Sequence, residues 1–357
     1  MLSKALTQTP TISVVIPAYN ARAFILDALE SVRRQTRRPD AIIVVDDGST
    51  DGTSDVVRHW SLRTGTFVDL LRQPNGGAAA ARNAGIRRTL TTYMALLDAD
   101  DLFEPNHLAV LEAALHAHPE AVLAFGRSRL VAIDGRNIGW FPGTRIDRVP
   151  VLAEHEGVRL LGPQFATLAA GSYIAVSATL LKRAAAHAIG LMDEDLSPNE
   201  DLDFLLRLSR IGSFAYAPQL VASTRRHAAN TTHPRNAFQT NLAKFKTLSK
   251  AKRHAARLRL TADERQATEE ATKELVPYLL YGSSRRGLRT YLRMWVQLVR
   301  AGFIVPCMNP RHGARAMIYS VMPSGVPGLS SQSESNAQQV PTPPSPSPMA
   351  DIYHPKS

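Results

Sequence analysis

Three short acidic clusters are the residues of this 357-residue chain most able to do chemistry. Asp98-Ala99-Asp100-Asp101 directly follows the apolar run YMALL, so two of its carboxylates stand two residues apart. Hard oxygen ligands of this kind suit Mg²⁺ or Mn²⁺, and a divalent ion there could neutralise a diphosphate. An acidic loop that caps the helix expected near Pro105 would have the same composition, so this cluster alone does not establish a metal site.

Two adjacent carboxylates, Asp46 and Asp47, follow the apolar run AIIVV and open the segment DDGSTDGT. Turn and helix-capping chemistry explains the Ser, Thr and Gly residues of this segment, and also Asp51. It does not explain two neighbouring carboxylates at a strand end, whose repulsion must be offset by a ligand or a cation. The pattern therefore favours a binding site here.

The third cluster, Asn199-Glu200-Asp201, opens a predicted helix with the sequence DLDFLLRLSRIG. Acidic residues in the first turn of a helix ordinarily complement the helix dipole. Taken alone, the cluster favours that structural role, and a catalytic interpretation depends on the other two clusters.

The first hundred residues alternate between short β-branched runs and amphipathic stretches, which is typical of a doubly wound α/β sheet with its site at the carboxyl ends of the strands. Strands are predicted at 11–16, 41–45, 67–71 and 93–97. Helices are predicted at 23–34, from about 53, at 77–90 and at 105–118.

The pattern is mixed from 121 to 226 and then becomes helical. Strands are predicted at 121–125 and 129–133, helices at 177–188 and 200–210, and a strand pair within 213–224. Residues 236–320 are predicted to be helical with several breaks. From 324 to 357 the chain is rich in Ser and Pro with few large apolar residues, which predicts disorder.

Taken together, these motifs resemble glycosyltransferase family 2, whose members have the GT-A nucleotide-sugar-binding fold. The matching segments occur in the family's order and approximate spacing: VIPAYN (15–20), DDGSTDGT (46–53), NGG (75–77), ARNAG (81–85), LDADD (97–101) and NED (199–201). With NGG and ARNAG counted as one motif, these are five motifs in register, which form a far more specific signal than any one of them.

The resemblance implies a mixed, mainly parallel sheet flanked by helices, with a C-terminal helical extension. The expected organisation is an N-terminal extension at 1–10, a GT-A catalytic domain at 11–235, a basic helical extension at 236–323 and a disordered tail at 324–357. The implied reaction is inverting transfer of a hexose from a nucleoside diphosphate sugar, by family tendency a UDP-sugar. The acceptor would be a hydroxyl of a growing polysaccharide or lipid-linked glycan.

The resemblance also assigns roles to residues. Asp201 would be the general base that takes the acceptor proton, with Glu200 beside it. The divalent ion, Mn²⁺ or Mg²⁺, would be held by Asp100 and Asp98, with His227 completing its shell. The donor would contact Pro17, Ala18, Tyr19, Asn20, Asp47, Arg82, Asp98 and Arg226. A surface-helix role for Arg82 and a solvated basic loop around His227 are the open alternatives.

The net charge of +11 lies almost wholly in one C-terminal segment, because residues 240–320 hold 16 basic and 5 acidic side chains. Within it, 282–305 carries apolar residues at helical spacing among arginines. Such a helix can lie on an anionic membrane or pack on the catalytic domain with a basic outer face. Nucleic acid is a poorer partner, since the segment has few aromatics and no binding motif.

The remaining features limit the class of protein. The single cysteine, Cys307, excludes a disulfide framework and a Cys-based zinc site and indicates a reducing compartment. The N-terminus has no apolar secretory segment, so we expect a cytoplasmic protein with peripheral contact at the inner face of the plasma membrane. An inactive nucleotide-sugar-binding protein is the main alternative. A sugar nucleotidyltransferase is disfavoured because no Gly-rich phosphate loop follows the first strand.

Overall fold

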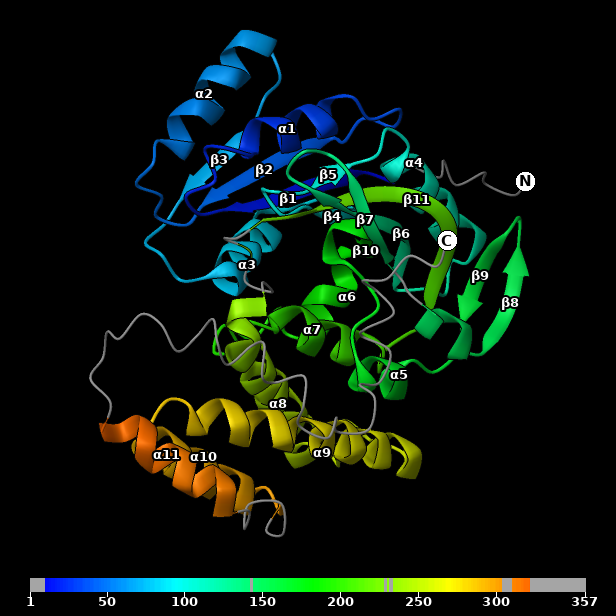
Figure 1. Cartoon of the computed structure of the whole chain (residues 1–357). Coiled ribbons are helices and arrows are strands. Elements are labelled where there is room, and N and C mark those ends of the chain that lie inside the picture. Colours follow the sequence, from blue (N-terminus) through cyan, green and yellow to red (C-terminus); the bar gives the residue numbers. More distant parts are fainter. Residues whose placement is uncertain (1–9, 142–143, 228–229, 231–233, 304–309, 322–357) are drawn as a thin grey trace.

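The computed structural model describes residues 10–141, 144–227, 230, 234–303 and 310–321. The predicted disordered tail at 324–357 and nearly all of the N-terminal extension therefore lie outside the described residues. A single mixed sheet runs through the molecule, and helices cover both of its faces (Figure 1).

The N-terminal half of the sheet is parallel, in the order β3-β2-β1-β4. Its strands are β1 (Ile12–Ala18), β2 (Ala41–Asp46), β3 (Asp69–Arg72) and β4 (Tyr93–Leu96). The helices that alternate with them are α1 (Ile25–Arg33), α2 (Thr53–Thr64), α3 (Ala78–Arg88) and α4 (His107–Ala117). The βα alternation predicted from the apolar runs is confirmed. Most of these strand residues are buried, because the sheet is covered on both faces.

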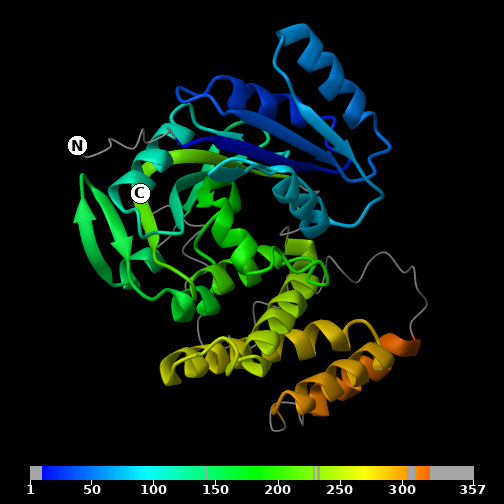
Figure 2. The same ribbon diagram turned by 180° about the vertical axis from the view of Figure 1, so that it is seen from behind.

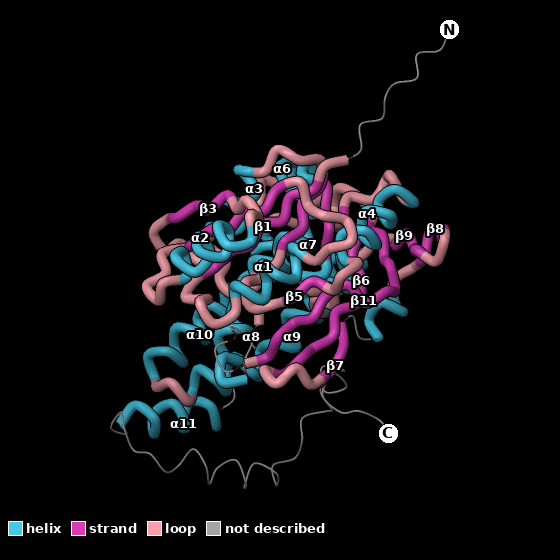
Figure 3. The backbone as a smooth tube through the Cα atoms, turned by 90° about the horizontal axis from the view of Figure 1, so that it is seen from above, coloured by secondary structure: helices cyan, strands magenta, loops and turns pink. Residues whose placement is uncertain are grey.

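The second half of the sheet is mixed and continues in the order β4-β10-β6-β11-β9-β8. Figures 2 and 3 show the molecule from behind and from above. Its strands are β6 (Leu123–Ala132), β8 (Val151–His155), β9 (Val158–Leu161), β10 (Thr179–Lys182) and β11 (Phe214–Arg226). Two short strands pair along its margins, β5 (Leu102–Phe103) with β11 and β7 (Asn137–Phe141) with β6.

Three predictions for this half were wrong. The two strands predicted at 121–125 and 129–133 are one strand, β6, and the predicted strand pair within 213–224 is one bulged strand, β11, parallel to β6. The helix predicted at 177–188 begins as the 3-10 turn η2 (Val176–Ala178) and strand β10, and only α6 (Arg183–Ala188) is helical. β10 is extended because β4 and β6 bond to it on both sides.

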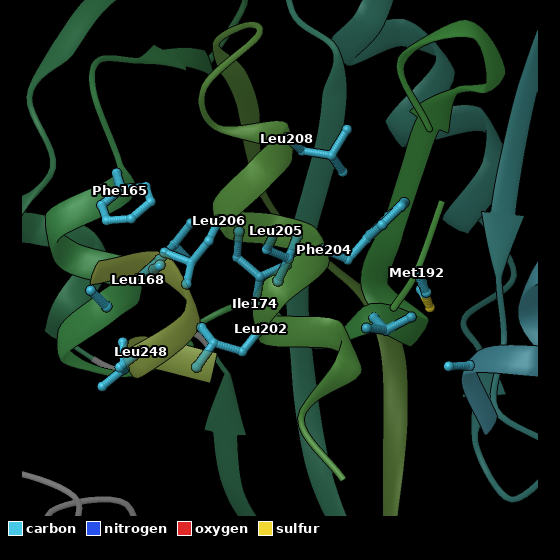
Figure 4. Packing of buried hydrophobic residues seen from close by; sticks show 14 of the residues in the cluster. Phe165, Leu168, Ile174, Met192, Leu202, Phe204, Leu205, Leu206, Leu208 and Leu248 are labelled. Atoms are coloured by element: carbon cyan, nitrogen blue, oxygen red, sulfur yellow. The ribbon is translucent and has the colours of Figure 1, made fainter. Parts of the chain in front are cut away.

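The apolar core is divided by the sheet. One face packs against α1, α2 and α4. The other packs against α3, α5 (Phe165–Ala170), α7 (Glu200–Leu208) and the C-terminal helices. Figure 4 shows Leu202 and Leu206 of α7 on the side of Phe165, Leu168 and Leu248. Burying this face of α7 fixes the direction in which its first turn, with the acidic residues, projects.

The C-terminal segment is helical, as predicted. It consists of α8 (Ala237–Arg253), α9 (Ala262–Ser284), α10 (Leu288–Arg300) and α11 (Pro310–Val321), which lie together below the sheet in Figure 1. α9 starts at a capping box, in which the hydroxyl of Thr261 accepts the Glu264 N–H and the Glu264 carboxylate accepts the Thr261 N–H. Phe245 and Leu279 belong to the same core cluster as Val15 of β1, so these helices share the core of the sheet.

The structure also bears on how the chain could meet a membrane. None of the helices in the described ranges combines the length and apolarity that crossing a bilayer requires. α10 buries Tyr291, Met294 and Leu298 within the protein core. One side of α10 therefore packs in the protein, which is the alternative to membrane contact that the sequence left open.

Candidate active site

Three segments that are distant in sequence meet at the guanidinium of Arg82, on α3. Its Nη2 donates to Asp98 Oδ1 at 2.6 Å, and its Nη1 donates to Glu200 Oε1 at 2.6 Å. Asp98 lies two residues after the end of β4, and Glu200 is the first residue of α7. Arg82 is only 6% exposed, so it is not the surface-helix residue that the sequence left as an alternative.

The protonation of Arg82 depends on the two carboxylates that it contacts. Burial lowers the pKa of Arg82, but the negative charges of Asp98 and Glu200 outweigh burial and raise it above its usual range. Arg82 therefore stays protonated, and it compensates two carboxylates that would otherwise repel each other. The acidic clusters at 98–101 and 199–201 are thus brought together by Arg82.

Asp201 stands next to Glu200 in the first turn of α7. Burial raises its pKa to about 6, the charge of Glu200 adds to this effect, and the positive charge of Arg82 opposes it. One carboxylate oxygen accepts the Leu202 N–H at 2.7 Å. Because its pKa is raised but still below 7, Asp201 is ionised at neutral pH and more basic than an ordinary aspartate, which suits a general base.

Asp100 faces the end of β11, away from the Arg82 pair. Its Oδ2 lies 3.0 Å from Nε2 of His227 and accepts from the side-chain amide of Asn230 at 3.0 Å. The imidazole of His227 stacks on the ring of Phe24, with centroids 4.7 Å apart. The predicted partners Asp100 and His227 are therefore in contact, and Phe24, at the start of α1, packs against the imidazole.

The acidic loop is further tied to β11 through Asp101. This buried carboxylate accepts the backbone N–H of Arg225 at 3.0 Å, and burial with the charge of Asp100 raises its pKa well above its usual range. The Arg225 side chain in turn donates to Asp27 of α1 at 2.8 Å. The loop, the end of β11 and α1 form one connected unit around His227.

The side chains around Asp100 can be compared with the ligands that a divalent ion prefers. Burial and the charge of Asp98 raise the pKa of Asp100, and His227 opposes them, so a cation would relieve this crowding. In the described ranges, no group of three His, Cys, Asp or Glu side chains is close enough to hold a metal, since Asp98 is turned to Arg82. Mg²⁺ and related ions commonly take one or two protein ligands together with substrate phosphates. The Asp100–His227 pair fits that mode.

Residues 13–158 match the family described as Glycosyl transferase family 2. The chain contains a domain of this family. The match runs from β1 through the acidic loop at 98–101 to the start of β9.

Relatives support the same assignment. An uncharacterized glycosyltransferase of Rickettsia typhi is 28% identical over 229 residues, covering 64% of this chain and 67% of the relative. The putative teichuronic acid biosynthesis glycosyltransferase TuaG of Bacillus subtilis is 36% identical over 134 residues, covering 37% of this chain and 52% of its own length.

Solved structures agree on the GT-A fold. Residues 1–349 of Staphylococcus aureus TarS in complex with UDP align with a TM-score of 0.51 at 17% identity, covering 83% of this chain and 89% of that one. The mannosyltransferase PcManGT of Pyrobaculum calidifontis, in complex with GDP-Man and Mn²⁺, aligns with a TM-score of 0.50 at 16% identity, covering 89% of both chains. At these identities the alignments establish the fold alone.

Within the family 2 domain, the end of β1 carries the predicted wall of the nucleotide pocket, formed by Pro17 to Asn20. Tyr19 is 54% exposed and therefore available for stacking. Asn20 has a left-handed backbone, with φ at 48°, and its side-chain oxygen accepts the Thr50 N–H at 2.9 Å. The carbonyl of Ala18 accepts the Asp47 N–H at 2.8 Å. The loops after β1 and β2 are thus locked together.

Asp47 is buried and accepts three hydrogen bonds, from the Gln73 amide and from the backbone N–H groups of Gly76 and Gly77, at 2.8–2.9 Å. Its neighbour Asp46 accepts the Ser49 N–H at 2.8 Å and bonds the hydroxyl of Ser54. Burial raises the pKa of Asp46, but these bonds prevail and lower it overall. The expectation that a ligand or cation must offset this carboxylate pair was wrong, because the protein's own donors do so.

The predicted donor contact Arg226 ends β11, directly before His227. Sequence reasoning missed several residues that hold the site. Phe24 and Asn230 contact His227 or Asp100, and the Ser177 hydroxyl accepts the Asp98 N–H at 3.2 Å. Only Asn230 carried a local signal, its position three residues after His227. The others meet the site through tertiary contacts alone.

Replacing Arg82 by Met is expected to lower the free energy of unfolding by about 3 kcal/mol, because it leaves the buried Glu200 and the partly buried Asp98 without their cationic partner. Arg87→Met, on the same helix but exposed and 3.5 Å from Glu194, is the matched control and should cost less than about 0.5 kcal/mol. Urea unfolding measures both. Adding Glu200→Gln to Arg82→Met should recover part of the loss, and equal stability of the two single variants would contradict the assigned role.

Proposed function

We propose that this protein is an inverting, metal-dependent glycosyltransferase. It would transfer a hexose from a nucleoside diphosphate sugar, by default a UDP-sugar, to a hydroxyl of a glycan or lipid-linked acceptor. The observation that carries the proposal is the Arg82 bridge. It holds Asp98, on the loop that also carries the metal ligand Asp100, against the helix end that carries Asp201. The loop that would bind the nucleotide-sugar donor and a base of suitable pKa thus belong to one site.

In this reaction Asp201 takes the proton of the acceptor hydroxyl while its oxygen attacks the anomeric carbon. A new C–O bond forms on one face as the bond to the diphosphate breaks on the other, so the anomeric configuration inverts and the nucleoside diphosphate leaves. Glu200 contributes by raising the basicity of Asp201. No covalent intermediate with the protein is needed.

Asp100 and His227 would hold Mn²⁺ or Mg²⁺, and Asp98 lies on the same loop. When bound, the ion supplies positive charge that stabilises the departing diphosphate. The PcManGT complex with GDP-Man and Mn²⁺ supports this assignment by analogy of fold. The TarS complexes with UDP and UDP-GlcNAc support a nucleotide-sugar donor.

The donor is tested with a panel of UDP-glucose, UDP-GlcNAc and GDP-mannose in the presence of Mn²⁺, scored by the rise in unfolding temperature and by donor hydrolysis. The alternative function, a nucleotide-sugar-binding protein without catalysis, would give stabilisation but no hydrolysis or transfer. The intact carboxylates Asp98, Asp100 and Asp201 favour the enzyme. The configuration of the product, read by NMR, tests inversion.

Asp201→Asn is expected to lower kcat by about 10²–10⁴-fold, because the amide cannot accept the acceptor proton, while the Kd for the nucleotide stays nearly unchanged. For the unaltered protein, kcat should fall about tenfold per pH unit below about pH 6, since protonation of Asp201 removes the base. Asp195→Asn, an exposed carboxylate on the preceding loop, is the control. Full turnover in Asp201→Asn, or loss of nucleotide binding with it, would contradict the role.

His227→Ala is expected to weaken Mn²⁺-dependent donor binding by about tenfold or more, because one of the two protein ligands is lost. Calorimetric titration of UDP with and without Mn²⁺ measures the effect. Binding without the ion should be the same in both proteins. His59→Ala, at an exposed position on α2, is the control. Unchanged donor affinity and turnover in His227→Ala would remove this residue from the site.

We also propose peripheral contact with anionic membranes through residues 282–305. Although α10 buries one side, Leu292 and Val296 are 49% and 39% exposed, one turn apart. The exposed Arg289 and Arg293 flank them. An apolar pair bordered by cations is the pattern that favours adsorption to an anionic bilayer surface.

This contact predicts co-sedimentation with vesicles that contain about 30% phosphatidylglycerol, weakened at high salt because surface charge is then screened. Replacing both Leu292 and Val296 by Glu should abolish it. Leu62→Glu, at a still more exposed apolar position on α2 (84% exposed), should leave it intact. Failure of the unaltered protein to sediment with anionic vesicles would dispose of the membrane proposal.

A further inference from the structure

Two cations from separate elements converge at the carbonyl end of α5. Lys244, on α8, donates from Nζ to the carbonyl of Ala170, the last residue of α5, at 2.8 Å. Arg145, on the 3-10 turn η1 (Thr144–Arg148), places its guanidinium over the next residue, Gly171. Its atoms lie only 3.0–3.2 Å from the position that a Cβ on Gly171 would occupy. A side chain larger than hydrogen at Gly171 would push the guanidinium away.

These cations have no acidic partner in contact. Within the part of the chain that the structure describes, neither Arg145 nor Lys244 forms an ion pair. Burial and the nearby charge of Arg145 lower the pKa of Lys244 to about 8, and Glu274 of α9 opposes them from beyond ion-pair distance. Burial and the charge of Arg148 lower the pKa of Arg145 as well. Like charges are thus held together in a partly buried place, where an anion would stabilise them.

The C-terminal end of α5 satisfies only one of the hydrogen-bond donors of these two cations. The carbonyl end of a helix attracts cations, but α5 has only 6 residues, and the carbonyl of Ala170 takes one of the three protons of Lys244. The guanidinium of Arg145 makes no hydrogen bond within the described ranges. Donors of both side chains therefore remain for a ligand.

The pair lies beside the segments that carry the proposed base. One turn before Lys244 on the same side of α8, the carbonyl of Thr240 accepts from the side chain of Asn199, the residue that precedes Glu200 and Asp201, at 3.4 Å. On the other side, the segment that starts at Gly171 leads to Ser177, which bonds the N–H of Asp98. α5 itself packs against α7 (Figure 1).

We propose that Arg145 and Lys244 form a subsite for an anionic group, a carboxylate or a phosphate, of the acceptor. This inference rests on the proposed glycosyl transfer. The donor diphosphate belongs to the loop of Asp100 and His227, whereas this pair lies by α5 and α8, among the helices around Asp201. The substrate class that follows is an acidic glycan, such as a uronic-acid or sugar-phosphate polymer. A guanidinium and an ammonium group recognise either anion through charge-assisted hydrogen bonds.

The test compares three acceptors that differ in one group: p-nitrophenyl glucoside, p-nitrophenyl glucuronide and p-nitrophenyl glucoside 6-phosphate. Each is supplied with Mn²⁺ and the donor selected by the nucleotide-sugar panel. The unaltered protein should use, or be stabilised against thermal unfolding by, at least one anionic acceptor at concentrations about tenfold lower than the neutral one. The two anionic arms distinguish a carboxylate from a phosphate as the group recognised.

Lys244→Gln and Arg145→Gln should each remove most of this preference, lowering kcat/KM for the anionic acceptor about tenfold and leaving the neutral acceptor unchanged. Lys246→Gln, at an exposed position on the same helix, is the matched control. Donor hydrolysis, which needs no acceptor, should be unchanged in all three variants. Its absence in the unaltered protein would instead count against the glycosyltransferase proposal itself.

Two results would overturn the subsite. One is equal response of the unaltered protein to the neutral and both anionic acceptors, in transfer and in thermal stabilisation. The other is an anionic preference that survives in both Lys244→Gln and Arg145→Gln. If these variants only lower the unfolding temperature and keep the preference, the two cations stabilise the end of α5 and do not bind the acceptor.

Discussion

The arrangement of the site depends on one buried guanidinium that neutralises two carboxylates from different parts of the chain. Arg82 reaches Asp98 and Glu200 with separate N–H groups, each at 2.6 Å. A lysine could not reproduce this, since a single ammonium group lacks the rigid planar fork that addresses two carboxylates at once. The charges are stable in a buried place only as a group. The loop after β4 and the first turn of α7 are therefore held together, although 102 residues separate Asp98 from Glu200.

The same cation also limits how basic the site becomes. Burial and the charge of Glu200 raise the pKa of Asp201, and Arg82 opposes them, so that the result is about 6. Without the positive charge of Arg82, the pKa of Asp201 would rise further, and the carboxylate would be protonated in neutral solution. If Arg82 cancelled the effects of burial and of Glu200 completely, Asp201 would be as weak a base as an exposed aspartate. The balance of three neighbouring charges places it between these limits.

The carboxylates of the acidic loop after β4 contact two different sets of partners. Asp98 turns to Arg82 and the helix of the proposed base, whereas Asp100 turns to His227 and Asn230 at the end of β11. The C-terminal helices complete the other side, because α8 contacts Asn199 and brings Lys244 to the end of α5. The basic extension is therefore part of the molecule's core and of the surroundings of its site.

The sequence by itself determined the parallel half of the sheet and the identity of the acidic clusters, because short β-branched runs and turn residues act locally and the motifs keep a fixed order. Tertiary structure decided the rest. TLLK became the strand β10 because β4 and β6 needed a partner between them. Asp47 found its compensation in Gly76 and Gly77, and Arg82 found Glu200, 118 residues away. Local periodicity in the sequence does not predict such contacts, since they form only when the chain packs.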